Sequence, residues 1–182
     1  MRSVLFLAAL ALSACQHAAP PSTASTYSGE EVREIKSLSA DEVRGYLSGA
    51  GLGYAKAAEL NGYPGPRHVL DLADSLALTL DQRRRVEESF RTMQVEARAR
   101  GRELVAAESA LDRLFAEGQA NGEEVRSLTE ASAEIEGRVR AAHLAAHLDM
   151  VAVLTPAQVA RYNRLRGYEA EEAPAAHHGH QH

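Results

Sequence analysis

The chain has 182 residues, which suits one domain of ordinary size, and 45% of them are hydrophobic while 25% are charged. Aromatic residues make up only 5% and Trp is absent, so the core must be aliphatic and alanine-rich, a composition that favours packed helices over sheets. The net charge of −5 argues against general nucleic-acid binding. The single Cys excludes an intramolecular disulfide and any CxxC metal or redox site.

The N-terminus has the pattern of an export signal. Arg2 supplies a positive start, and the apolar run from Val4 to Leu12 is too short to span a bilayer. The tetrapeptide Leu-Ser-Ala-Cys that ends at Cys15 is similar to a bacterial lipobox, in which the Cys is lipidated and becomes the mature N-terminus. The sequence therefore predicts a lipoprotein signal peptide over residues 1–14 and a lipid on Cys15. The alternative is an ordinary signal peptide that happens to contain a Cys.

The segment after the signal peptide is rich in Pro, Ser, Thr and Ala, and it predicts a flexible tether over residues 15–35. Gln16 follows the Cys, and by resemblance to sorted lipoproteins a residue other than Asp at this position implies the outer membrane. We therefore expect a periplasmic protein that is anchored to the outer membrane by its N-terminal lipid.

From residue 36 to residue 168 the apolar period is helical almost throughout, and three helix starts share one design. Ser39 and Glu42 can form a capping box, in which the N-cap side chain and the third helical side chain each accept a hydrogen bond from the other's backbone N–H. Thr and Gln repeat this chemistry in two Leu-Thr-x-x-Gln motifs, the second with Pro at the first helical position. The motif residues are Leu78, Thr79, Gln82, Leu154, Thr155 and Gln158.

Repeated Gly and Pro over residues 49–67 predict a loop with one short helix, and a helix over residues 68–77 should follow it. The main element is a long hairpin, because apolar residues recur in steps of three, four or seven over 83–116 and again over 123–153. Asn121-Gly122 should provide the turn between them. At about 1.5 Å of rise per residue, each arm is about 45–50 Å long. Two such helices cannot bury a broad core alone, so the short helices must pack on them or two chains must pair as a homodimer.

Two Leu-Thr-x-x-Gln motifs that lie 76 residues apart and flank an Ala-, Arg- and Glu-rich hairpin in an exported chain resemble the Spy/CpxP family of periplasmic helical proteins. The resemblance covers residues 38–166 and includes the metal-linked relatives of the ZraP and CnrX type. It implies an all-α fold, namely a long antiparallel helical hairpin with shorter flanking helices, usually dimeric and without enzymatic activity. Members of the family are ATP-independent chaperones, inhibitors of envelope stress sensors, or metal-responsive sensor domains. The lipid anchor and a His-rich tail depart from Spy and CpxP, and the tail gives the metal-linked relatives more weight.

Two histidines, His143 and His147, share one face of the second arm at a spacing that can chelate one metal ion. Met150 lies beside the same apolar stripe of this arm, as the two histidines do. Two imidazoles with a thioether suit Cu, Ni or Co better than Mg or Ca. His68 stands at the start of the predicted short helix, where the helix dipole favours a neutral ring, and it can complete the site from another helix or subunit. The alternative is that these histidines are only packed or solvated and that Met150 is part of the core.

The C-terminal segment, residues 169–182, predicts a disordered tail with four imidazoles that capture Ni, Cu or Zn. Any such run of histidines captures these ions in a test tube, so the pattern leaves its physiological role open. The tail histidines are His177, His178, His180 and His182.

The sequence carries no nucleophile motif and no phosphate-binding loop, so we expect no enzyme and no organic cofactor. Arg dominates residues 83–102 and acidic residues dominate 103–136, which indicates either solvated faces with interhelical ion pairs or a basic surface for acidic or unfolded clients. The sequence thus predicts a non-enzymatic periplasmic lipoprotein that binds or senses Ni, Cu, Co or Zn in envelope or metal stress. The alternative is an ATP-independent chaperone or an inhibitor of a membrane stress regulator.

Overall fold

The computed structural model describes residues 25–168 of the chain, which divides into two units, residues 1–31 and 32–182. In the first unit, residues 25–31 form turns, and the Tyr27 N–H donates to Ser25 Oγ at 3.1 Å. The predicted signal peptide, the lipidation site at Cys15 and the His-rich tail all lie outside the described residues.

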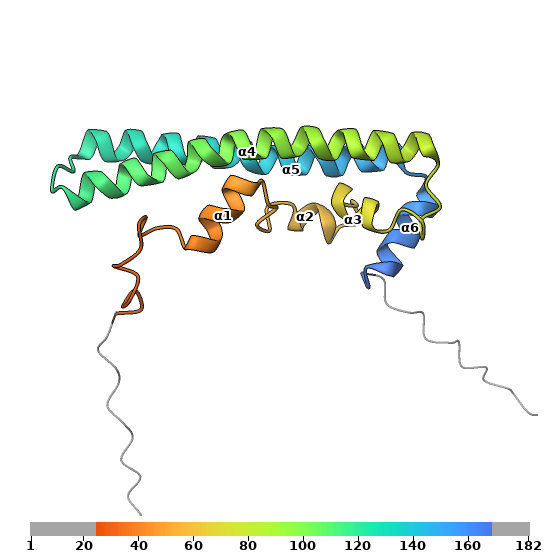
Figure 1. The fold of residues 1–182 in the computed structure, drawn as a ribbon, viewed down its shortest axis with the longest axis horizontal. Helices are drawn as coiled ribbons and strands as arrows, with labels where there is room; N and C mark the ends of the chain where they lie inside the picture. The colour runs from red at the N-terminus through yellow and green to blue at the C-terminus, as the bar shows by residue number, and fades with distance from the viewer. Residues whose placement is uncertain (1–24, 169–182) are drawn as a thin grey trace, which may run out of the picture. The chain divides into compact units, whose positions relative to one another are not determined.

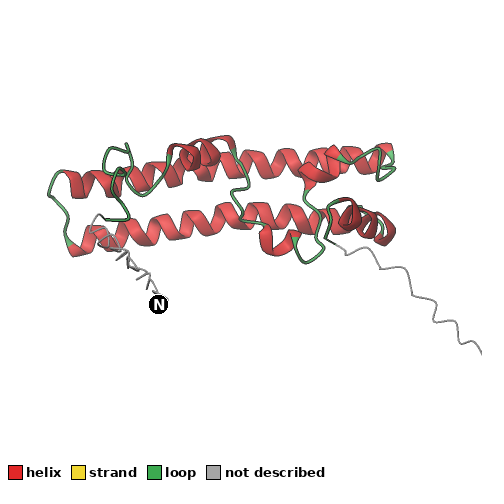
Figure 2. Cartoon of the chain, turned by 90° about the horizontal axis from the view of Figure 1, so that it is seen from below, coloured by secondary structure: helices red, strands yellow, loops and turns green. Residues whose placement is uncertain are grey.

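The second unit contains a long helical hairpin, formed by α4 (Leu80–Ala116) and α5 (Gly122–Val153), which lie antiparallel and side by side (Figure 1). All regular structure between residues 25 and 168 is helical, which confirms the predicted fold class (Figure 2). Within that range no helix is both long enough and apolar enough to cross a membrane. The shorter helices that flank the hairpin are α1 (Ala40–Ser48), α2 (Lys56–Glu59), α3 (Pro66–Asp71) and α6 (Pro156–Leu165).

The two Leu-Thr-x-x-Gln motifs begin α4 and α6, and both form the predicted capping boxes. Their glutamines also bond each other: Gln82 Nε2 donates to Gln158 Oε1 at 2.8 Å, and Gln158 Nε2 donates to Gln82 Oε1 at 3.1 Å. In addition, Gln82 Nε2 donates to the carbonyl of Val153, and Gln158 Nε2 donates to that of Leu76. The pair therefore fastens the starts of α4 and α6 to the end of α5 and to the chain before α4.

The hairpin turn differs from the predicted turn at Asn121-Gly122. Gly118, with a left-handed φ of 67°, follows the end of α4. Asn121 is instead the N-cap of α5, because its Oδ1 accepts from the N–H groups of Glu123 and Glu124. Asn favours both turns and helix N-caps, and here the second role is the one that the chain uses.

The helix predicted over residues 68–77 is also different in the structure. It begins at Pro66 and ends at Asp71, and the chain continues through turns to Ala77, whose φ of 50° is left-handed. The N–H groups of Ala77 and Leu78 reach back to earlier carbonyls in the Schellman pattern that ends helices. The predicted apolar face is nevertheless kept, and its buried members are Val69, Ala73 and Leu76.

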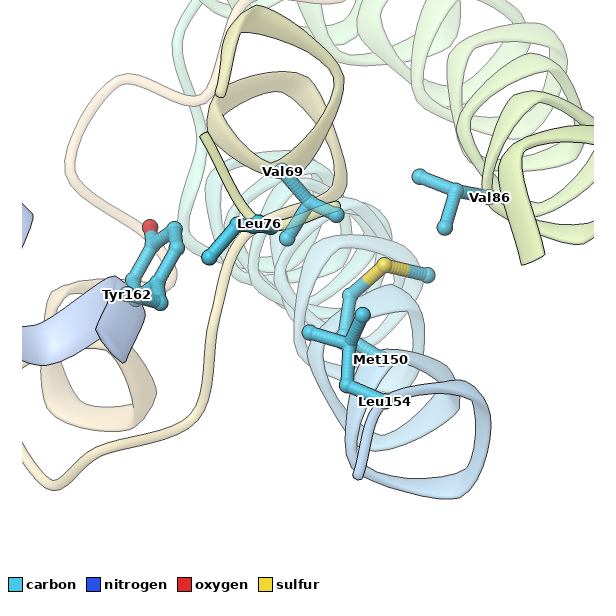
Figure 3. Packing of buried hydrophobic residues seen from close by; sticks show 6 residues of the cluster. All are labelled: Val69, Leu76, Val86, Met150, Leu154 and Tyr162. Atoms are coloured by element: carbon cyan, nitrogen blue, oxygen red, sulfur yellow. The ribbon is translucent and has the colours of Figure 1, made fainter. Parts of the chain in front are cut away.

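The apolar core lies where α3, α4, α5 and α6 meet, and Met150 of α5 points toward Val69 and Val86 there (Figure 3). Full burial of side chains of this size contributes about 1.5–3 kcal/mol each. Farther along the hairpin, the contact between α4 and α5 buries single residues, such as Met93 and Val139. The members of the core cluster are Val69, Leu76, Val86, Met150, Leu154 and Tyr162.

Helix α1 docks on α4 at a glycine. Gly101 is buried in α4, and a Cβ built on it would lie 2.2 Å from the carbonyl oxygen of Tyr46 in α1. Only a residue without a Cβ lets two backbones approach this closely. The contact fixes α1 against the hairpin, and the loop that follows α1 then runs beside α5, where Tyr54 stacks on His143.

The interhelical ion pairs suggested for the hairpin do not form between α4 and α5 in the described part of the chain. The charged side chains pair within one helix instead, at a spacing of three or four residues. Such exposed pairs contribute little to stability, because the solvent screens the attraction between their charges. They are Arg84 with Asp81, Arg100 with both Glu96 and Glu103, and Arg138 with Glu134.

Candidate metal pocket

A pocket of about 420 Å³ lies beside the histidine pair of α5. His143 and His147 line it from α5, and His68 lines it from α3. The loop after α1, residues 49–53, forms part of the wall. The fold therefore brings three of the predicted ligands to one pocket, from segments that are far apart in the sequence.

His143 is 4% exposed, and its Nε2 is buried without a hydrogen-bond partner in the part of the chain that the structure describes. The ring stacks on Tyr54, with centroids 6.3 Å apart and 16° between the planes. Burial lowers the pKa of His143 and the nearby His147 lowers it further, while a backbone hydrogen bond with Ala50 raises it. The pKa is lowered on balance, which favours a neutral imidazole, the form that binds metal ions.

His147 is oriented by a backbone carbonyl. Its Nδ1 lies 2.8 Å from the carbonyl oxygen of Tyr63, and because a carbonyl only accepts, Nδ1 carries the proton of this hydrogen bond. In the neutral ring the lone pair is then on Nε2, which lies 3.2 Å from the position of a Cβ built on Gly65. A backbone carbonyl that holds one ring nitrogen and frees the other is typical of metal-binding histidines.

His68 is less well placed than the pair on α5. Its side chain is 42% exposed, and its Nδ1 lies 3.9 Å from Asp71 Oδ2. Within residues 25–168, no three His, Cys, Asp or Glu side chains are close enough together to hold a metal ion. The described residues thus present a pair of imidazoles and not a preformed three-histidine site.

Glu59 contributes a carboxylate to the pocket wall, but this group has other partners. Its Oε1 accepts from the hydroxyls of Tyr162 at 2.5 Å and Tyr168 at 3.0 Å, and it lies 3.4 Å from Arg166 Nε. Its Oε2 lies 3.8 Å from His147 Nδ1. Glu59 therefore ties α2 to α6, and sequence reasoning missed it because its partners are about a hundred residues away and no local pattern marks them.

The two methionines of the hairpin differ in their surroundings. Met150, a predicted ligand, is fully buried in the apolar core and does not line the pocket. Met93 of α4 lines the pocket and is 9% exposed. The apolar period places both residues near the contact between the two arms, so the period alone could not tell which thioether lines the pocket with the histidines.

The family model for heavy-metal resistance matches residues 47–161, which is more than half of the chain. The chain belongs to the heavy-metal resistance family. The matched segment includes His143, His147 and both Leu-Thr-x-x-Gln motifs, and it confirms the resemblance to the metal-linked helical proteins. Neither the curated proteins nor the solved structures include a significant match.

The pocket of this heavy-metal resistance protein has donors that fit a transition-metal ion. His143 offers a buried nitrogen that has no hydrogen-bond partner in the described part of the chain, His147 offers a ring that a carbonyl holds in place, and Met93 offers a thioether. Imidazole and thioether suit transition metals and not Mg or Ca. The tail histidines, His177, His178, His180 and His182, lie outside the described residues.

Proposed function

We propose that the chain is a non-enzymatic, exported protein that binds a heavy-metal ion in the pocket beside α5 as part of a response to metal stress. The observation that carries this proposal is the buried Nε2 of His143, which has no hydrogen-bond partner among residues 25–168 and lies one helical turn from the His147 ring that the Tyr63 carbonyl holds. An unsatisfied buried polar atom costs about 1–3 kcal/mol, and a metal ligated there would remove that cost. Membership of the heavy-metal resistance family supports the proposal that the bound ligand is a heavy-metal ion.

Each residue of the pocket has a distinct part in this proposal. His143 and His147 hold the ion through their Nε2 atoms. The Tyr63 carbonyl keeps the His147 ring oriented, and Tyr54 covers one face of the His143 ring. The bound ion supplies a cross-link between its ligands, and metal binding to folded ligands stabilises the fold.

The cellular setting is the other part of the proposal. A lipid on Cys15 would hold the protein at the outer membrane, facing the periplasm, and the tail histidines would collect Ni, Cu, Co or Zn. A homodimer would cover outward-facing apolar residues of α5, since Leu148 is 61% exposed and Val151 is 44% exposed. A membrane stress regulator would be a partner whose binding depends on whether the pocket holds an ion.

Calorimetric titration with Ni, Cu, Zn and Co tests the metal proposal. The full chain is used with Cys15→Ser and with the tail histidines changed to Gln, so that neither a thiol nor the tail binds. We expect one ion per chain, and we expect that His143→Gln with His147→Gln abolishes binding while circular dichroism shows the same helicity. His68→Gln is the matched control and should retain most of the affinity. An unchanged affinity in the double variant would refute the proposal.

A chaperone is the second candidate, because large apolar side chains are exposed on the outer surfaces of the hairpin, including Val95 at 65% and Phe115 at 57%. Such side chains can hold partly unfolded clients, although scattered exposed apolar residues are common on soluble proteins. Suppression of client aggregation, measured by light scattering with and without a chelator, separates the two functions. Protection that is equal in both conditions favours the chaperone, and protection that needs the ion favours the metal function.

A further inference from the structure

We infer that the pocket selects a soft monovalent ion, Cu(I) or Ag(I), over divalent ions, and that Met93 supplies the ligand that completes the histidine pair. The inference rests on the proposed function and deepens it, because it names the charge class of the ion and a ligand on the opposite arm of the hairpin.

The register of the hairpin places Met93 opposite the two histidines. The Ser89 hydroxyl of α4 donates to Asp149 Oδ2 of α5 at 2.7 Å, so these two residues are level with each other. The helices are antiparallel, and four residues forward from Ser89 corresponds to four residues back from Asp149. Met93 is therefore level with residue 145, midway between His143 and His147, and all three side chains line the same pocket.

The available donors favour a soft ion. In the described residues the pair is not part of any group of three His, Cys, Asp or Glu side chains that could hold a metal ion, which leaves the thioether of Met93 as the candidate ligand on the facing helix. Thioethers are weak ligands for Zn and Ni but good ligands for Cu(I), and a set of two imidazoles and one thioether suits the low coordination numbers of that ion. Ag(I) has the same charge and a similar preference for soft donors.

The fixed charges around the pocket favour an ion of low charge. Lys56, Arg67 and Arg166 line it, whereas Glu59 is the single carboxylate among the described lining residues. Glu59 already accepts hydrogen bonds from two tyrosines and lies beside Arg166, and Arg67 is paired with Asp71, which is outside the lining. The balance is positive, and electrostatic repulsion of a bound ion doubles when its charge rises from one to two. Neutral ligands do not offset that repulsion.

Titration of the Cys15→Ser chain with Gln in place of the tail histidines tests the inference, with Ag⁺ and Zn²⁺ as the probes. We expect Ag⁺ to bind at least tenfold more tightly than Zn²⁺. Met93→Leu should lower the Ag⁺ affinity tenfold or more and leave the Zn²⁺ affinity unchanged. Met150→Leu is the matched control, since it also removes a thioether at nearly constant volume, and it should change neither affinity.

A spectroscopic readout on the same Cys15→Ser chain, with Gln in place of the tail histidines, supports the titration. The methionine methyl groups are labelled with ¹³C, and the Met93 methyl resonance is assigned as the one that Met93→Leu removes. Ag⁺ should shift this resonance and leave the Met150 methyl resonance in place. Tighter Zn²⁺ binding, or an unshifted Met93 resonance in the Ag⁺ complex, would overturn the inference while the proposed function stands. Binding of either ion that survives loss of both His143 and His147 would overturn the inference and the proposed function together.

Discussion

Gln82 and Gln158 donate side-chain hydrogen bonds to each other, at 2.8 and 3.1 Å, although 76 residues separate them. Each side-chain carbonyl also accepts from the N–H of its own N-cap threonine, Thr79 or Thr155. The repeated motif is therefore one structural unit in the folded protein, a clasp between two helix starts that also caps each of them.

The clasp predicts an energetic coupling between its glutamines. Gln82→Ala and Gln158→Ala should each lower the free energy of unfolding by about 1–2 kcal/mol, because each removes a cap and leaves partly buried partners without a hydrogen bond. The double variant should lose less than the sum of the two, by about 0.5–1 kcal/mol. Urea denaturation measures the cycle. Glu42→Ala, which breaks only the local capping box of α1, is the control and should be additive with Gln82→Ala.

Replacement of glycine by alanine should have opposite effects on stability at Gly101 and Gly137, because only Gly101 lies at the close contact between α1 and α4. Gly101→Ala should cost at least about 2 kcal/mol, because its Cβ would lie 2.2 Å from the Tyr46 carbonyl oxygen and neither backbone can yield easily. Gly137→Ala in α5 should stabilise the protein by about 0.5–1 kcal/mol, because nothing lies within 4 Å of that Cβ and Ala is the better helix former. Thermal unfolding followed by circular dichroism compares them. A stable Gly101→Ala variant would mean that α1 does not pack on α4 in this way.

Ala77, which precedes α4, has a left-handed backbone conformation, so a glycine at this position should stabilise the protein. Ala77 has a φ of 50°, a conformation that disfavours a Cβ, so Ala77→Gly should raise the free energy of unfolding by about 0.5–1 kcal/mol. Gly49 ends α1 with a φ of 71°, and Gly49→Ala should therefore change stability in the opposite direction. Chemical denaturation of the two variants checks the signs. A destabilised Ala77→Gly variant would show that the greater freedom of glycine in the unfolded chain outweighs the relief of strain.

The environment of His143 predicts a loss of stability in acid for the metal-free protein. Because burial lowers its pKa in the folded state, the unfolded chain binds a proton more readily at this position. The stabilisation is therefore fully present above the ordinary histidine pKa of about 6.5 and is lost as the pH falls toward the folded value.

Urea unfolding in a chelator at pH 7.5 and at pH 5.5 measures this effect. His143→Gln cannot take up the proton, so its free energy of unfolding should fall less between these two values than that of the unchanged chain. An identical decrease in both proteins would assign the acid sensitivity to other groups. Metal affinity should decrease over the same range, because a protonated imidazole cannot bind the ion.

The sequence alone determined the features that depend on neighbours a few residues away. Ser39, Thr79 and Thr155 cap helices through bonds to the third residue along, and the apolar period of the hairpin follows from the geometry of one helix. The positions of His143 and His147 on one face are predictable for the same reason. Even the misplaced turn was a local ambiguity, because Asn121 suits both a turn and an N-cap.

Only the tertiary structure decided which groups from different elements meet. A helical period places Met150 and Met93 near the contact between the two arms, but the antiparallel register of α4 and α5 is what places Met93 in the lining of the histidine pocket and leaves Met150 in the core. Glu59 meets Tyr162 only because α2 and α6 dock near each other, and Gln82 meets Gln158 only when the hairpin closes. These contacts depend on the packing of whole helices, which is a collective property of the core, and no local pattern in the chain carries that information.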